Sequence, residues 1–141
     1  WNGGTWTSRV RIWAVDHAGD EAALITPSLE ARYPLLAAAA DTTTIPPHPL
    51  PPTREGLSVS RRGVLVTAFG ADPSNAGTLL RLWELAGDSG ALTVKLPNGF
   101  QATRAVPVNL RGETAGKPVP IRRGEFQFLL VPFAPASFLL E

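Results

Sequence analysis

Residues 78–96, TLLRLWELAGDSGALTVKL, decide the fold. The run Thr78–Leu85 is followed by the turn formers Gly87–Gly90 and then by the run Ala91–Leu96. In the second run apolar and polar residues alternate, which places Leu92 and Val94 on one face of a strand. The pattern therefore predicts two successive β-strands, each with a single buried face.

Further strand signals recur on both sides of this stretch, at the spacing of 8–12 residues typical of a β-sandwich. The predicted strands are Leu57–Ser60, Val64–Phe69, Ala105–Leu110, Glu125–Val131 and Ala136–Leu140. Pro107 has no N–H to donate and shifts the third of these towards a sheet edge. In the strand Glu125–Val131 the predicted buried face is Phe126, Phe128 and Leu130. In the strand Ala136–Leu140 it is Phe138 and Leu140. Such strands bury one face each by forming an antiparallel β-sandwich, so the predicted class is all-β.

The N-terminal part is predicted to begin with one more strand, over residues 6–15. In it Val10 and Ile12 share one face, and the turn formers at 16–20 end it. Residues 21–40 are rich in helix formers but carry Pro27 and Pro34, so at most a short helical turn is expected there.

A proline-rich connector separates this segment from the main strands. Residues 45–53 hold five prolines in nine positions, which favours an extended polyproline-like path over a surface. We expect one sandwich domain over 1–141, with an N-terminal strand segment (1–40), a connector (41–56) and the main strands (57–141).

Composition excludes several classes of function. The 141 residues carry a net charge of +1, which gives no long-range attraction to nucleic acid or to an anionic membrane surface. No cysteine is present, so disulfides and thiolate metal sites are excluded. The first residue is Trp1 and methionine is absent, which favours a fragment of a longer protein.

Residues with catalytic or metal-binding chemistry are few. His17 lies among three carboxylates at 16–21, but their spacing matches no zinc or calcium motif and is typical of a turn. No nucleophile motif is present. Glu84 is interpreted as an outward polar residue of a half-exposed sheet. No catalytic, cofactor-binding or metal-binding residue is assigned in this chain.

Aromatic residues beside charges offer a binding role instead. Trp13 shares a predicted strand face with Arg11, and Trp83 shares one with Arg81. Each tryptophan is expected in the core or at an interface, and stacking on a sugar ring is the alternative. The candidate contacts with sugar or with another domain are Trp13, Trp83, Arg81, Asp16 and His17.

From Gly56 onward the chain resembles the C-terminal β-domain of glycoside hydrolase family 38, the α-mannosidases, in its bacterial branch. The likeness is carried by 63–70 (GVLVTAFG), 77–84 (GTLLRLWE), 107–113 (PVNLRGE) and 134–138 (APASF). The stretches 11–14 and 30–35 fit the same family less closely.

The resemblance implies a parent enzyme with a zinc ion and an aspartate nucleophile, both in an N-terminal catalytic domain upstream of any matching residue. The chain itself is then expected to be a non-catalytic domain without a cofactor, packed against and supporting the catalytic domain of the same polypeptide. One alternative is an independent carbohydrate-binding module for mannose-containing sugars. A second is an oligomerisation or interaction domain.

Overall fold

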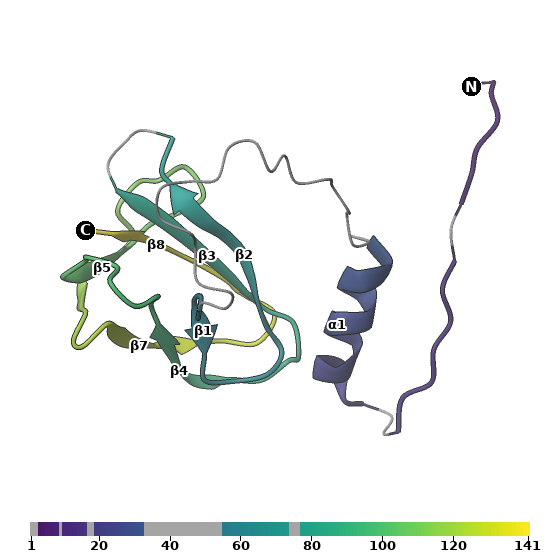
Figure 1. The fold of residues 1–141 in the computed structure, drawn as a ribbon, viewed down its shortest axis with the longest axis horizontal. Coiled ribbons are helices and arrows are strands. Elements are labelled where there is room, and N and C mark those ends of the chain that lie inside the picture. The colour runs from purple at the N-terminus through teal and green to yellow at the C-terminus, as the bar shows by residue number, and fades with distance from the viewer. Residues whose placement is uncertain (1–2, 9, 17–18, 33–54, 74–76) are drawn as a thin grey trace, which may run out of the picture.

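Among the residues that it describes, the computed structural model contains one helix and eight strands, and the strands form two antiparallel sheets (Figure 1). This arrangement confirms the predicted all-β, sandwich-like class. The structure describes residues 3–8, 10–16, 19–32, 55–73 and 77–141. The elements are α1 (Glu21–Arg32), β1 (Ser58–Val59), β2 (Val64–Ala71), β3 (Thr78–Glu84), β4 (Gly90–Lys95), β5 (Arg104–Pro107), β6 (Val119–Pro120), β7 (Glu125–Leu130) and β8 (Pro135–Leu140).

The two sheets differ in size. One has three strands in the order β1-β4-β7, and the other has five in the order β2-β3-β8-β5-β6. The stretch that decides the fold crosses between them, because β3 pairs with β2 and β8 whereas β4 pairs with β1 and β7. Residues 85–89 thus join the two layers of the sandwich instead of closing a hairpin.

The core lies between the sheets and is built by the predicted faces. Leu80 of β3 and Leu92 and Val94 of β4 are fully buried. Phe128 and Phe138, from opposite sheets, meet edge to face with ring centroids 4.6 Å apart. Alternation along each strand therefore identified the residues that hold the layers together.

The edge of the larger sheet lies one strand further out than predicted. β5, which Pro107 was expected to place at an edge, lies between β8 and the two-residue strand β6. β6 pairs only with Arg104 and Ala105, so Pro107 lies beyond that pairing and its missing N–H breaks no bond to β6. The sequence analysis missed β6 because Val119–Pro120 is too short to show alternation.

The N-terminal strand prediction was wrong. The described residues of 6–15 form no strand, and Val10 and Ile12 are 80% and 91% exposed. The segment runs alongside α1 (Figure 1). Alternation produces a strand only where a neighbouring edge supplies hydrogen bonds, and none of the described residues does so for this segment.

The prediction of at most a helical turn after it was also wrong, because Glu21–Arg32 form a helix of 12 residues with Pro27 inside. The helix is capped by Asp20, whose Oδ1 accepts the N–H of Ala23 at 3.1 Å. Glu21 in the first turn and Arg32 in the last complement the helix dipole. Of the connector predicted over 41–56, only Glu55 and Gly56 lie among the described residues.

Candidate functional site

A groove on the outer face of the five-stranded sheet brings Trp83 and Arg81 together. Along β3 the side chains of Leu80, Leu82 and Glu84 are buried, so Arg81 and Trp83 lie on the opposite face. The groove has a volume of about 280 Å³. We call it the sheet groove; its lining residues are Thr67, Arg81, Leu82, Trp83, Leu110, Pro135 and Ser137.

Strand register sorts this lining into an apolar row and a polar row. Trp83 lies opposite Pro135 of β8, and Arg81 lies opposite Ser137. Thr67 of β2 is the extra residue of a β-bulge, since the pairing with β3 skips from Val66 to Ala68. A bulge redirects the side chain that it inserts, and here that side chain lines the groove beside the polar row.

The polar groups of the sheet groove retain free hydrogen-bonding capacity. Nη2 of Arg81 donates to the carbonyl oxygen of Leu110 at 3.2 Å, which fixes the guanidinium under that residue. Nε of Arg81 is buried and has no hydrogen-bond partner among the described residues. Ser137 is only 8% exposed, and its backbone carbonyl accepts the N–H of Val108 at 2.9 Å. Trp83, 46% exposed, forms the aromatic wall.

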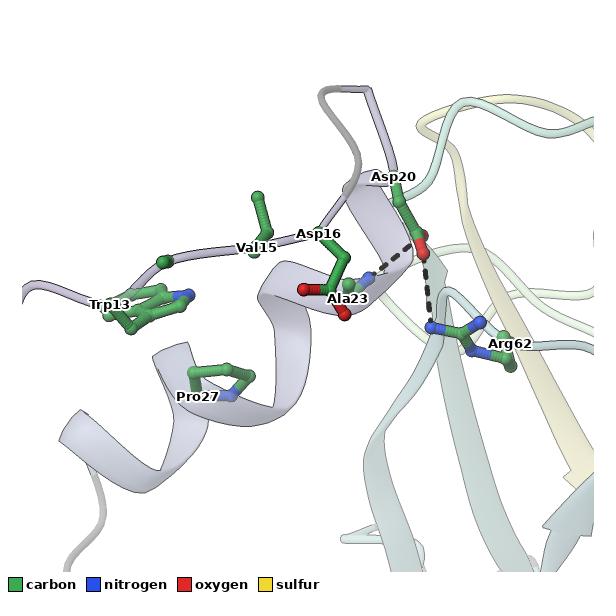
Figure 2. Close-up of a pocket in the computed structure, with 8 residues that line it drawn as sticks. Trp13, Val15, Asp16, Asp20, Ala23, Pro27 and Arg62 are labelled. Atoms are coloured by element: carbon green, nitrogen blue, oxygen red, sulfur yellow. Dashed lines mark hydrogen bonds and ion pairs between the residues drawn. The ribbon is translucent and has the colours of Figure 1, made fainter.

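A second pocket, of about 310 Å³, lies where the N-terminal segment runs beside α1 (Figure 2). Trp13 and Asp16 of the segment lie over Ala23 and Pro27 of the helix. We call it the N-terminal pocket; it is completed by Ala14, Val15, Asp20 and Arg62.

Asp20 connects this pocket to the sandwich. Its Oδ2 lies 3.5 Å from Nη2 of Arg62, while its Oδ1 caps α1. The Arg62 side chain is 74% exposed, so this ion pair contributes little stability by itself. Asp20 therefore serves to position the helix against the loop that precedes β2.

The cluster around His17 is only partly described. His17 lies outside the described residues. Asp20, at the end of the cluster, is the helix cap. Among the residues that the structure describes, no group of three His, Asp or Glu side chains is arranged to hold a metal ion.

Glu84 is the buried acidic residue of the described chain, and its interpretation as an outward residue was wrong. It is fully buried, on the inward face of β3. Its carboxylate accepts four backbone N–H groups: Ala86 at 3.0 Å, Gly87 at 2.9 Å, Asp88 at 3.2 Å and Phe133 at 2.8 Å. Burial raises the pKa of Glu84, but these donors outweigh it and the pKa lies below its ordinary value.

Four of the five predicted contact residues separate into two sites, and the fifth, His17, lies outside the described residues. Trp83 and Arg81 line the sheet groove, and Trp13 and Asp16 line the N-terminal pocket. The sequence analysis missed Thr67 and Ser137. Ser137 could have been found, because alternation with the inward Phe138 places it on the outer face, whereas no sequence signal marked the bulge at Thr67.

No family model, curated protein or solved structure matches this chain. Within the described residues, no helix has the length and apolar character needed to cross a membrane.

Proposed function

We propose that this chain is a non-catalytic β-sandwich domain from the C-terminal end of a larger glycoside hydrolase resembling the α-mannosidases. Its role is to pack against and support the catalytic domain of the same polypeptide. The identity of the parent enzyme rests on the sequence resemblance at 63–70, 77–84, 107–113 and 134–138. The zinc ion that the resemblance implies belongs to that catalytic domain.

The observation that carries the packing role is the exposed apolar surface of the N-terminal segment. Trp6, Val10 and Ile12 are 79%, 80% and 91% exposed, within seven residues of one another. Covering apolar surface is worth about 25 cal/mol per Å², and clustered exposure of this kind marks an interaction site. A catalytic domain seated here would bury these side chains and supply hydrogen-bond partners for the extended backbone.

The position of Glu84 supports a structural role for the sandwich. A catalytic carboxylate must reach its substrate, whereas that of Glu84 faces the interior and is occupied by four backbone amides. It ties residues 86–88 to Phe133 and so holds two loops together.

Substitution of Ile12 by Asp in the whole parent enzyme tests the proposal. We expect Ile12→Asp to lower the melting temperature of the whole enzyme, because a charge then faces the catalytic domain. In the isolated 141-residue chain the same change alters the free energy of unfolding by less than about 0.5 kcal/mol, since the side chain is exposed there. Leu129→Asp, at an exposed position of β7, is the matched control.

Two results contradict the proposal. The first is a whole enzyme whose stability is unaffected by Ile12→Asp. The second is hydrolysis of an aryl α-mannoside by the isolated chain at an enzyme-like rate.

A further inference from the structure

We infer that α1 closes onto the outer face of the five-stranded sheet, where Ile25 and Leu29 pack against Leu65 and Trp83. This movement goes beyond the packing role, because it uses the side of the helix that faces the sheet instead of the N-terminal segment. It is measured on the isolated chain, whereas the packing role is tested in the whole enzyme, so failure of one is distinguishable from failure of the other.

An apolar groove of about 360 Å³ lies between the helix and the sheet. On the sheet side, Leu65 of β2 lies opposite Trp83 of β3, and Trp83 is 46% exposed. Well-packed protein contains few voids larger than a water molecule, so a space of this size between two apolar walls is a gap that closure can fill. We call it the helix groove; its apolar lining is Leu24, Ile25, Leu29, Leu65, Trp83 and Leu85.

The helix lies outside both sheets (Figure 1) and is held to the sandwich at its first turn. Asp20, its cap, pairs with Arg62 at 3.5 Å. Ala22 lies so close to Gly63 that a Cβ added to the glycine would be 3.5 Å from the Cβ of Ala22. None of the described side chains of α1 is buried. A helix of 12 residues is marginal in water by itself, so α1 gains stability when it buries an apolar face.

The spacing of residues in α1 places such a face towards the sheet. Ala22, Ile25 and Leu29 follow one another at intervals of three and four residues, so they share one side of the helix. Ala22 already lies against the sandwich, and the other two line the helix groove. Ala23 and Pro27, which line the N-terminal pocket, lie on the opposite side. The helix can therefore close by pivoting at its first turn, without rotating about its own axis.

The charged residues of the helix groove are compatible with closure. Glu21 and Arg32 are the first and last residues of α1, so both stay at the rim when the two walls meet. Closure removes apolar surface from water on both walls, and this gain needs no partner from outside the chain. The occupant of the groove is therefore the helix itself.

Nuclear Overhauser spectroscopy of the isolated chain tests the inference. We expect cross-peaks between the methyl groups of Ile25 and Leu29 and the indole protons of Trp83. Leu29→Asp removes the cross-peaks of Ile25, because closure would then bury an unpaired charge. Glu30→Asp, at an exposed position of the same helix, is the matched control and keeps them.

A second measurement follows the exposure of Trp83 in a chain whose other tryptophans, Trp1, Trp6 and Trp13, are replaced by phenylalanine. Leu29→Asp in this background raises the quenching of Trp83 by acrylamide about two-fold, because the equilibrium shifts from the covered indole to the half-exposed one. The inference is overturned if the wild-type chain shows no cross-peak between α1 and Trp83, or if Leu29→Asp leaves the quenching unchanged. Either result would mean that the helix groove stays open to an apolar molecule from outside.

Discussion

At the scale of single residues, Glu84 shows how a buried charge becomes part of the framework. Its carboxylate lies in the core layer but receives N–H groups from Ala86, Gly87, Asp88 and Phe133. Gly87 and Phe133 both adopt positive φ, +79° and +53°. The φ of Gly87 is one that other residues rarely adopt, and a Cβ there would lie 2.8 Å from the Phe133 ring, so glycine is favoured where the two loops meet.

Because the pKa of Glu84 is lowered in the folded state, the link that its carboxylate makes between the two loops depends on pH. A carboxyl whose pKa is lower in the folded than in the unfolded state stabilises the fold above its unfolded pKa, about 4.3. That contribution is lost as the pH falls through the folded value, because protonation removes an acceptor for the backbone amides. Acid is therefore expected to loosen residues 86–88 and the loop at Phe133.

Glu84→Gln is predicted to lower the free energy of unfolding by about 2–4 kcal/mol at pH 7, because its amide nitrogen faces backbone donors. The same variant should lose less stability than the wild type as the pH falls from about 5 to about 3, through the unfolded pKa of a glutamate and below it. Urea unfolding at several pH values measures both effects. Glu125→Gln, at an exposed position of β7, is the control. A change below about 0.5 kcal/mol at pH 7 would show that the four hydrogen bonds carry no net stability.

At the scale of elements, α1 and the segment before it show where local patterns mislead. Pro27 argued against a helix, but the Asp20 cap and the charges at both ends favour one. Residues 6–15 alternate like a strand in sequence, and yet the described ones, 6–8 and 10–15, lie exposed without a strand partner among the described residues. A helix satisfies its backbone hydrogen bonds within itself, whereas a strand needs a neighbouring strand to bond with. Among the described residues, no such strand lies beside this segment.

Asp20→Ala is predicted to destabilise the first turn of α1 by about 0.5–2 kcal/mol, the usual cost of a lost cap. Because α1 lies outside the two sheets, amide hydrogen exchange at Ala23 reports this change better than global unfolding does. Glu30→Ala, exposed within the same helix, is the matched control. Unchanged exchange at Ala23 in Asp20→Ala would contradict the capping role.

At the scale of the whole molecule, the sequence predicted the sandwich fold and its buried faces, but only some of the residues that line the grooves on its surface. Leu92 and Val94 stand two residues apart, as do Phe126 and Phe128, so each pair lies on one face of its strand. Both pairs belong to the core or pack against it, and the core faces could therefore be predicted from the sequence. Three features could not be predicted from the sequence: the strand order, the bulge at Thr67 and the inward orientation of Glu84. Each depends on the register between strands that lie far apart in the chain. Trp83 and Arg81 were found as neighbours on one strand, whereas their partner Ser137 comes from β8.

The packing of this domain against a catalytic domain is tested most directly by supplying it in trans. The catalytic part of the parent enzyme, expressed without residues 1–141, is heated in a calorimeter with increasing amounts of the isolated chain. We predict a melting temperature that rises with the concentration of added chain, as expected when a partner binds only the folded state, and no rise with the Ile12→Asp chain. A melting temperature that stays constant at every concentration of the wild-type chain would contradict the account.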